Sequence, residues 1–238
     1  MRRLSNLIIE LNRDRKKSTP DILSPMWRRL AQPGLGFLVV SAFASGFAAL
    51  ALELRWGREL ALTFGSSQYA VAAVLTAFMV GLGVGTALGG WLADRLRSPA
   101  LAVAVIELAL AGIGPLVSLG LLRLPNAAAK VLPMAVDATC GPFLLGRLAI
   151  GVAVLLVPTC LMGAGFPLLA RAAARSVPEF HRSIGKLMAA ATLGGVAGAA
   201  ATGFLLLPGG GIPWAVIGAA LANIVAGGAA ALSLGRIP

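Results

Sequence analysis

Six long apolar segments, separated by short polar or charged connections, fill the chain from residue 34 onward. Each is near or above the roughly 20 residues with which a helix crosses a hydrocarbon layer about 30 Å thick. We therefore predict an all-α membrane protein with six transmembrane helices. Charged residues from Arg55 to Glu59 predict an outer loop, and Pro208-Gly209-Gly210-Gly211 predicts a very short outer turn. The six segments are 34–55, 68–92, 99–122, 141–165, 183–207 and 213–233.

Positive charge is spread unevenly over the connections. With a cytoplasmic N-terminus, fifteen of the 20 Lys and Arg residues fall on the inner side, where membrane proteins carry an excess of these residues. An even number of spans returns the C-terminus to the same side. The pattern predicts a multi-pass protein of a bacterial-type inner (plasma) membrane with both termini cytoplasmic. The basic residues outside or near the outer face are Arg55, Arg58, Arg123, Lys130 and Arg147.

Composition supports the membrane assignment. Hydrophobic residues make up 58% of the chain and charged ones 12%, about half the charge of an average soluble domain. A net charge of +11 would suggest nucleic-acid binding in a soluble protein. Here orientation and anionic inner-leaflet lipids account for it, so we expect membrane lipids and no nucleic acid as partners. With one His and two Cys, we expect no metal site and no cofactor.

Two regions follow from these patterns. Residues 1–33 form a basic cytoplasmic leader, and residues 34–238 form the transmembrane domain. Apolar residues of the leader recur at i, i+3, i+4 and i+7, which is typical of one helical face. The leader is either a short amphipathic helix in the headgroup region or a solvated tail with a chance spacing. The apolar residues are Leu4, Leu7, Ile8 and Leu11.

Glycines recur every four residues in two of the spans, at Gly81, Gly85 and Gly89 and again at Gly194 and Gly198. A nucleotide-binding glycine loop would need a preceding strand and a solvent-facing helix, whereas these glycines lie inside apolar spans. Their spacing predicts a stripe without side chains, against which another helix packs closely. Two inverted three-helix repeats would explain why the stripe occurs twice, and so would low complexity in apolar segments.

Ionisable residues inside the spans are costly in hydrocarbon and often functional. Glu107 lies in the third span, Arg147 in the fourth, and Glu53 beside Arg55 and Arg58 at the outer end of the first. They are candidates for a substrate or proton site between helices, or for charge pairs that hold helices together. Arg147 and Glu53 could equally extend to the interface.

Glu107 is predicted to face the protein interior, because a carboxylate in contact with lipid tails would be the costlier arrangement. Ile106, Leu108 and Leu110 are expected to cover the lipid side, and the small residues Ala104, Ala111 and Gly112 are expected to lie on the path to neighbouring helices. No catalytic Ser–His pair or intramembrane aspartate pair is formed by the sequence, so we expect no enzymatic activity.

The sequence resembles the membrane-embedded half of the spermidine synthase-like membrane proteins. In that family a cytosolic aminopropyltransferase-like domain follows, and the resemblance implies the membrane module without that domain. Ala191 stands where relatives usually have Asn. The residues that carry the resemblance are Ser45-Gly46-Phe47-Ala48-Ala49-Leu50, Glu53, Trp56, Arg58, Phe64-Gly65-Ser66-Ser67, Tyr69-Ala70, Phe78-Met79, Gly81-Leu82, Gly85, Gly90, Leu92-Ala93-Asp94-Arg95, Pro158-Thr159, Leu161-Met162-Gly163-Ala164, Phe166-Pro167-Leu168-Leu169-Ala170-Arg171, Gly185-Lys186-Leu187 and Thr192-Leu193-Gly194.

The module also resembles half of a major facilitator superfamily transporter. Gly90, Asp94 and Arg95 lie between the second and third spans, where that superfamily keeps a cytoplasmic motif, although Arg97 and Ser98 depart from it. Asp94 and Arg95 are expected to cap helix ends and to pair with the neighbouring inner loop.

Two functions are compatible with these features. The first is a scaffold or accessory subunit that associates with itself or with other membrane-protein subunits. The alternative is a half-transporter for a small, amine-like solute that works as a dimer. A cavity lined by Glu107 and Glu53 would favour transport, and a tightly packed bundle would favour the scaffold.

Overall fold

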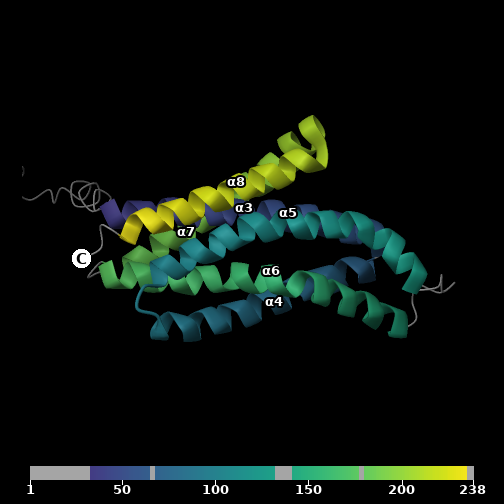
Figure 1. Ribbon diagram of the computed structural model, residues 1–238, viewed down its shortest axis with the longest axis horizontal. Coiled ribbons are helices and arrows are strands. Elements are labelled where there is room, and N and C mark those ends of the chain that lie inside the picture. The colour runs from purple at the N-terminus through teal and green to yellow at the C-terminus, as the bar shows by residue number, and fades with distance from the viewer. Residues whose placement is uncertain (1–32, 65–67, 132–140, 177–179, 235–238) are drawn as a thin grey trace, which may run out of the picture.

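The computed structural model describes residues 33–64, 68–131, 141–176 and 180–234, and within these ranges the regular elements are all helical. The long helices lie side by side along the long axis of the bundle (Figure 1). Pro33 and Pro99 begin two of them, at a position where the missing N–H costs nothing. The elements are α3 (Pro33–Phe64), α4 (Gln68–Arg95), α5 (Pro99–Val131), α6 (Gly141–Ser176), α7 (Phe180–Ala200), the π-helical η1 (Ala201–Leu206) and α8 (Leu207–Leu234).

Five described segments are long and apolar enough to cross a membrane. Large apolar side chains also cover the outside of the bundle, such as Leu116 with 68% of its surface exposed and Phe204 with 80%. Soluble proteins rarely expose contiguous apolar surface on this scale, so the fold indicates a multi-pass membrane protein. The five segments are Gly34–Leu62, Val71–Arg95, Pro99–Arg123, Ala149–Ala174 and His181–Leu234.

The last of these segments contains a break at Gly211, where φ is 70° and ψ is −161°. Glycine adopts such a positive φ without the steric cost that a Cβ would add. Figure 1 shows α8 running back from the turn along α3, and α3 contacts both α7 and α8. The prediction of a four-residue turn at Pro208–Gly211 was too long, because helical backbone continues on both sides of Gly211.

Helices also extend beyond the predicted apolar segments. The charged stretch from Arg55 to Glu59, which we predicted to be an outer loop, is part of α3. Arg55 and Glu59 lie one turn apart and form an ion pair of 2.8 Å, an arrangement that supports a helix. Trp56 between them is fully buried. The charge pattern was therefore a poor guide to the end of this helix.

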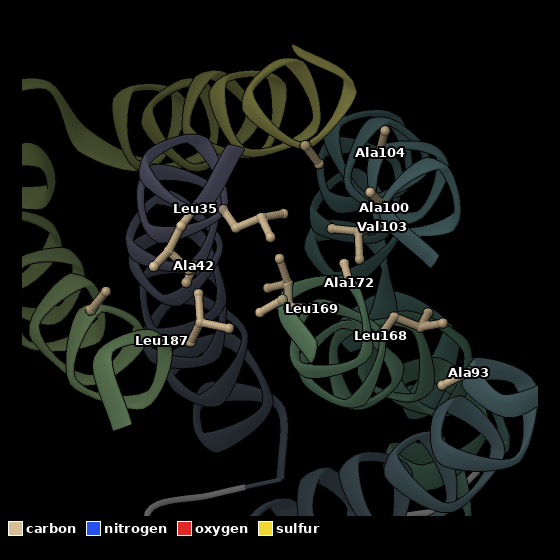
Figure 2. Close-up of a cluster of buried hydrophobic side chains, with 14 residues drawn as sticks. Leu35, Ala42, Ala93, Ala100, Val103, Ala104, Leu168, Leu169, Ala172 and Leu187 are labelled. Atoms are coloured by element: carbon tan, nitrogen blue, oxygen red, sulfur yellow. The ribbon is translucent and has the colours of Figure 1, made fainter. Parts of the chain in front are cut away.

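Each long helix packs against one or two main neighbours in the bundle. α4 packs on α6, α3 packs on α7 and α8, and α5 packs on α6 and α8. Figure 2 shows buried side chains from α3, α5, α6 and α7 converging at one end of the bundle. Many of them are alanines, so the helices approach closely while the larger leucines fill the remaining space. Labelled members of this cluster are Leu35, Ala42, Ala93, Ala100, Val103, Ala104, Leu168, Leu169, Ala172 and Leu187.

Both glycine stripes lie at helix contacts. On α4, a methyl group at Gly85 would overlap with the backbone of Cys160 on α6, and one at Gly89 would lie 2.6 Å from the Cα of Ala164. On α7, methyl groups at Gly194 and Gly198 would overlap with the backbone of α3. The packing role predicted for these glycines agrees with the structure.

Helix α6 continues through Pro158 and Pro167, although proline removes a backbone donor from the helix. Pro167 cannot donate to the carbonyl of Gly163, one turn earlier. The hydroxyl of Thr86 on α4 reaches this oxygen at 3.2 Å. A neighbouring helix thus replaces part of the lost hydrogen bonding, which bilayer lipid cannot do.

Candidate functional site

Glu107 lies at the meeting point of four helices. It is 1% exposed, and the hydroxyl of Ser45 on α3 donates a hydrogen bond to its carboxylate. A Cβ on Gly165 of α6 would lie 3.8 Å from Glu107 Oε1, and a Cβ on Gly227 of α8 would lie 3.4 Å from Glu107 Cβ. The prediction that Glu107 faces the interior is confirmed.

The residues next to Glu107 on α5 face the lipid side or the interior of the bundle only partly as expected. Leu108 is 53% exposed and faces outward, but Leu110 is 2% exposed and lies in the interior. The expectation for Leu110 was wrong, because a residue three positions after Glu107 shares its helix face. Ala104, three positions before, also lies on this face and packs against Gly227.

Several buried polar groups near this point have no hydrogen-bond partner. Glu107 Oε2 is one of them. Ser41 Oγ lies one turn before Ser45 on α3, and Asn223 Nδ2 lies one turn before Gly227 on α8. Ser41 is fully buried and Asn223 is 2% exposed. Unpaired polar atoms in an apolar interior are costly and call for an explanation in each case.

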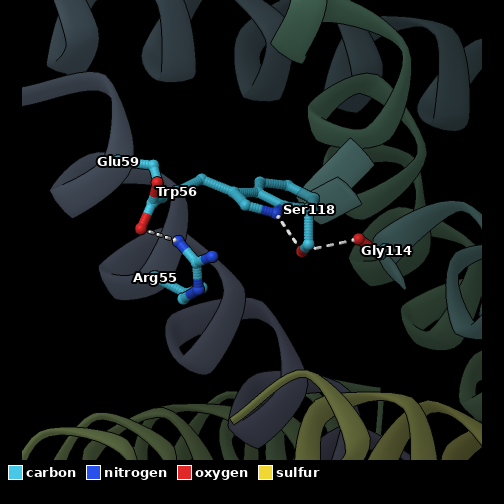
Figure 3. A network of polar contacts seen from close by, with 5 residues as sticks. All are labelled: Arg55, Trp56, Glu59, Gly114 and Ser118. Carbon is cyan, nitrogen blue, oxygen red and sulfur yellow. Dashed lines mark hydrogen bonds and ion pairs between the residues drawn. The ribbon is translucent and has the colours of Figure 1, made fainter. Parts of the chain in front are cut away.

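A second polar cluster lies toward the other end of α3 (Figure 3). Arg55 is 1% exposed and pairs with Glu59, while its Nε and Nη2 have no hydrogen-bond partner. Trp56 Nε1 donates to Ser118 Oγ on α5 at 2.9 Å, and Ser118 donates to the carbonyl of Gly114 at 2.8 Å. Arg55, predicted to lie in or near an outer loop, is instead a buried residue.

These two clusters are separate sites. Ser118 lies eleven residues beyond Glu107 on α5, which corresponds to roughly 16 Å of helix. Glu53 is partly buried and Arg58 is exposed on α3. Arg147 lies in α6, and its side chain is outside the described part of the protein. The structure thus distributes the candidate charges over different levels of the bundle.

The turn between α4 and α5 follows the expectation only in part, because Arg95 bonds to the end of its own helix while the residue near Asp94 lies in α6 and not in an inner loop. Arg95 donates to the carbonyl of Trp91 at 3.1 Å, and its guanidinium lies 3.8 Å from the centre of the Trp91 ring. Asp94 lies 3.9 Å from Arg171 of α6, with both side chains substantially exposed. This contact holds the turn near the end of α6 but contributes little free energy, since exposed ion pairs are weak.

Two hollows in the described surface have apolar linings. One of about 270 Å³ lies beside Trp214 and Leu205. The other, of about 520 Å³, is an open groove between α3 and α7. Neither is lined by Glu107 or Glu53. The groove is lined by Gly46, Leu50, Ala191, Thr192, Gly195, Val196 and Ala199.

Sequence reasoning missed Asn223, Ser41 and the pairing of Trp56 with Ser118. Asn223 could have been found, because a carboxamide inside an otherwise apolar span is the kind of polar group that marks a function or a helix contact. Serines in membrane helices commonly bond to their own backbone and carry no such signal.

In the ranges that the structure covers, no group of three or more His, Cys, Asp and Glu side chains is arranged to hold a metal ion. Comparison with known proteins gives no match to a protein-family model, to a curated protein or to a solved structure. What the geometry itself identifies is a multi-pass helical membrane protein with a buried carboxylate at the junction of four of its helices.

Proposed function

We propose that the chain is a six-span inner-membrane module with cytoplasmic termini, related to the membrane half of the spermidine synthase-like proteins. The break at Gly211 supports dividing the last apolar segment into two spans. Six spans then agree with the concentration of Lys and Arg on one set of connections. Asp94, Arg95 and Arg171 lie together at the end that the charge pattern assigns to the cytoplasm.

Two inverted three-helix repeats are the second part of the proposal. In such a repeat α3 corresponds to α6, α4 to α7 and α5 to α8. The α4–α6 contact then corresponds to the α7–α3 contact, and the α3–α8 contact corresponds to the α6–α5 contact. The glycine stripes lie on α4 and α7, which the repeat relates. A glycine of the facing helix also lies at each contact. Gly163 of α6 packs against the backbone of Leu82 on α4, and Gly46 of α3 packs against the backbone of Ala191 on α7. This correspondence of contacts supports the repeat over low complexity in apolar segments.

The module serves, in this proposal, as a scaffold or accessory subunit of a membrane assembly and has no enzymatic activity of its own. The observation that carries the proposal is the open groove between α3 and α7. On α7 the groove is lined by the short side chains of Ala191, Thr192 and Ala199, and short side chains allow the close approach by which membrane helices associate. We expect a transmembrane helix of a partner subunit to occupy it.

Purification of the tagged full chain in a gentle detergent, with mass spectrometry and light scattering, tests this function. A foreign membrane protein in fixed stoichiometry is the expected result. Thr192→Trp should fill the groove and release the partner. Leu193→Trp is a matched control, because Leu193 is 62% exposed and does not line the groove. A monomer carrying only lipid, or equal partner yield from both variants, would contradict the proposal, and a homo-oligomer would identify a second copy as the occupant.

Glu107 favours one second candidate, the half-transporter working as a dimer. A carboxylate with an unpaired oxygen in the membrane interior is a common feature of ion and proton pathways. In this candidate function Glu107 would carry the coupling ion.

A further inference from the structure

We propose that Glu107 binds a small monovalent cation, either a proton or an alkali metal ion, at the junction of α3, α5, α6 and α8. Such a site goes beyond the proposed scaffold role, which needs no ion, and it would supply the coupling ion of the transport alternative. Because it concerns binding to the isolated chain, its test is independent of whether a partner subunit exists.

The first step of the argument is charge. Glu107 is 1% exposed, and a buried carboxylate without a counter-charge costs several kcal/mol. Two ion pairs of the described residues join Arg55 to Glu59 and Arg171 to Asp94, and neither involves Glu107. A bound cation would supply the missing positive charge.

The second step is the set of available oxygens. Glu107 Oε2 has no partner, and the other carboxylate oxygen is hydrogen-bonded by Ser45. The Ser45 hydroxyl oxygen keeps lone pairs that can also face a cation. Carboxylate and hydroxyl oxygens are the ligand types that hard cations prefer, and either oxygen of the carboxylate can equally take a proton.

The third step is space. Gly165 leaves the α6 side of the carboxylate without a side chain, and a Cβ there would lie 3.8 Å from Oε1. Ser45 is only partly buried. The carboxylate is therefore covered by small groups on the side of α3 and α6, which is where an ion could enter with little rearrangement.

Thermal unfolding of the full chain in detergent tests the site, with sodium chloride compared with choline chloride at equal ionic strength and over a range of pH. Wild-type protein is expected to unfold at least ~3 °C higher when the cation saturates the site. Glu107→Gln should lose this dependence. Stabilisation by sodium identifies a metal ion, and stabilisation by acid alone identifies a proton.

Two further variants keep the test decisive if Glu107→Gln does not fold. Ser45→Ala retains the carboxylate but removes a hydrogen bond that favours its ionised form. If a metal ion binds, the sodium concentration needed for half-stabilisation should rise by about tenfold, which corresponds to the loss of one hydrogen bond or ligand at a charged group; if a proton binds, the stabilisation by acid should instead extend to higher pH. Glu53→Gln, on a carboxylate outside the junction, should leave the sodium dependence unchanged. The proposal is overturned if wild-type unfolding responds to neither sodium nor pH, or if the response persists in Glu107→Gln. Where Glu107→Gln does not fold, the proposal is overturned if the response of Ser45→Ala is the same as that of wild type.

Discussion

Replacing Gly85 with alanine should destabilise the protein, whereas the same change at Gly83, two residues earlier on the same helix, should not. At Gly85 the new methyl group would overlap with the carbonyl oxygen and Cα of Cys160 on α6. At Gly83 nothing lies within 4 Å of the new atom, and the residue is exposed on the outer side. The two substitutions are therefore chemically identical but differ in what the side chain meets.

The expected magnitudes follow from two terms. Alanine is favoured over glycine inside a helix by about 1 kcal/mol, and this gain applies at both positions. Overpacking costs typically about 1–3 kcal/mol, and it applies only at Gly85. The overlap there is with backbone, which cannot rotate away as a flexible side chain can. We expect Gly83→Ala to be neutral or stabilising, and Gly85→Ala to be less stable than Gly83→Ala by about 1–3 kcal/mol.

Reversible unfolding in mixed detergent micelles, followed by circular dichroism, measures this difference directly. Gly198→Ala extends the test to the other stripe, because its methyl group would overlap with the backbone of Phe47 on α3. Comparable losses at Gly85 and Gly198 are expected if the two contacts are related by the proposed repeat. If Gly85→Ala proves as stable as Gly83→Ala, helices α4 and α6 do not pack as closely as the structure indicates.

The remaining predictions concern topology, polar contacts and activity. Cysteines introduced near position 210 should react with an impermeant reagent from outside, and cysteines near 97 should not; the opposite pattern would overturn the assigned orientation. Ser118→Ala removes the acceptor of the Trp56 indole N–H and should cost about 1–3 kcal/mol, and the same substitution should cost less in a Trp56→Phe background, where no indole N–H is left unpaired. Glu107→Gln should unfold at a higher temperature than Glu107→Leu, because the amide still accepts from the serine hydroxyl on α3; equal stability would show that this hydrogen bond is unimportant. The purified chain should not convert putrescine to spermidine, and product in a mass-spectrometric assay would refute this expectation.

Local sequence was sufficient for the features that depend on composition alone. The apolar segments predicted from the sequence lie in helical parts of the structure, of which five segments are long and apolar enough to cross a membrane, because segment length and hydropathy are set by the bilayer and not by the packing partner. Glycine spacing likewise predicted contact faces on α4 and α7 before any neighbour was known. The interior orientation of Glu107 followed from the cost of exposing a carboxylate to lipid.

Tertiary structure decided which helices meet and where each helix ends. Arg55 and Glu59 form a buried helical ion pair in a stretch whose charge predicted a loop, because burial by the other helices of the bundle is not encoded in the residues of α3 alone. Leu110 faces inward because the buried face of α5 is set by the positions of its neighbours. Only the assembled bundle shows that Glu107, Ser45 and Gly165, which are far apart along the chain, surround one point in the membrane interior. Such long-range contacts depend on which helices pair, and the periodicity of apolar residues within one helix does not specify its partner.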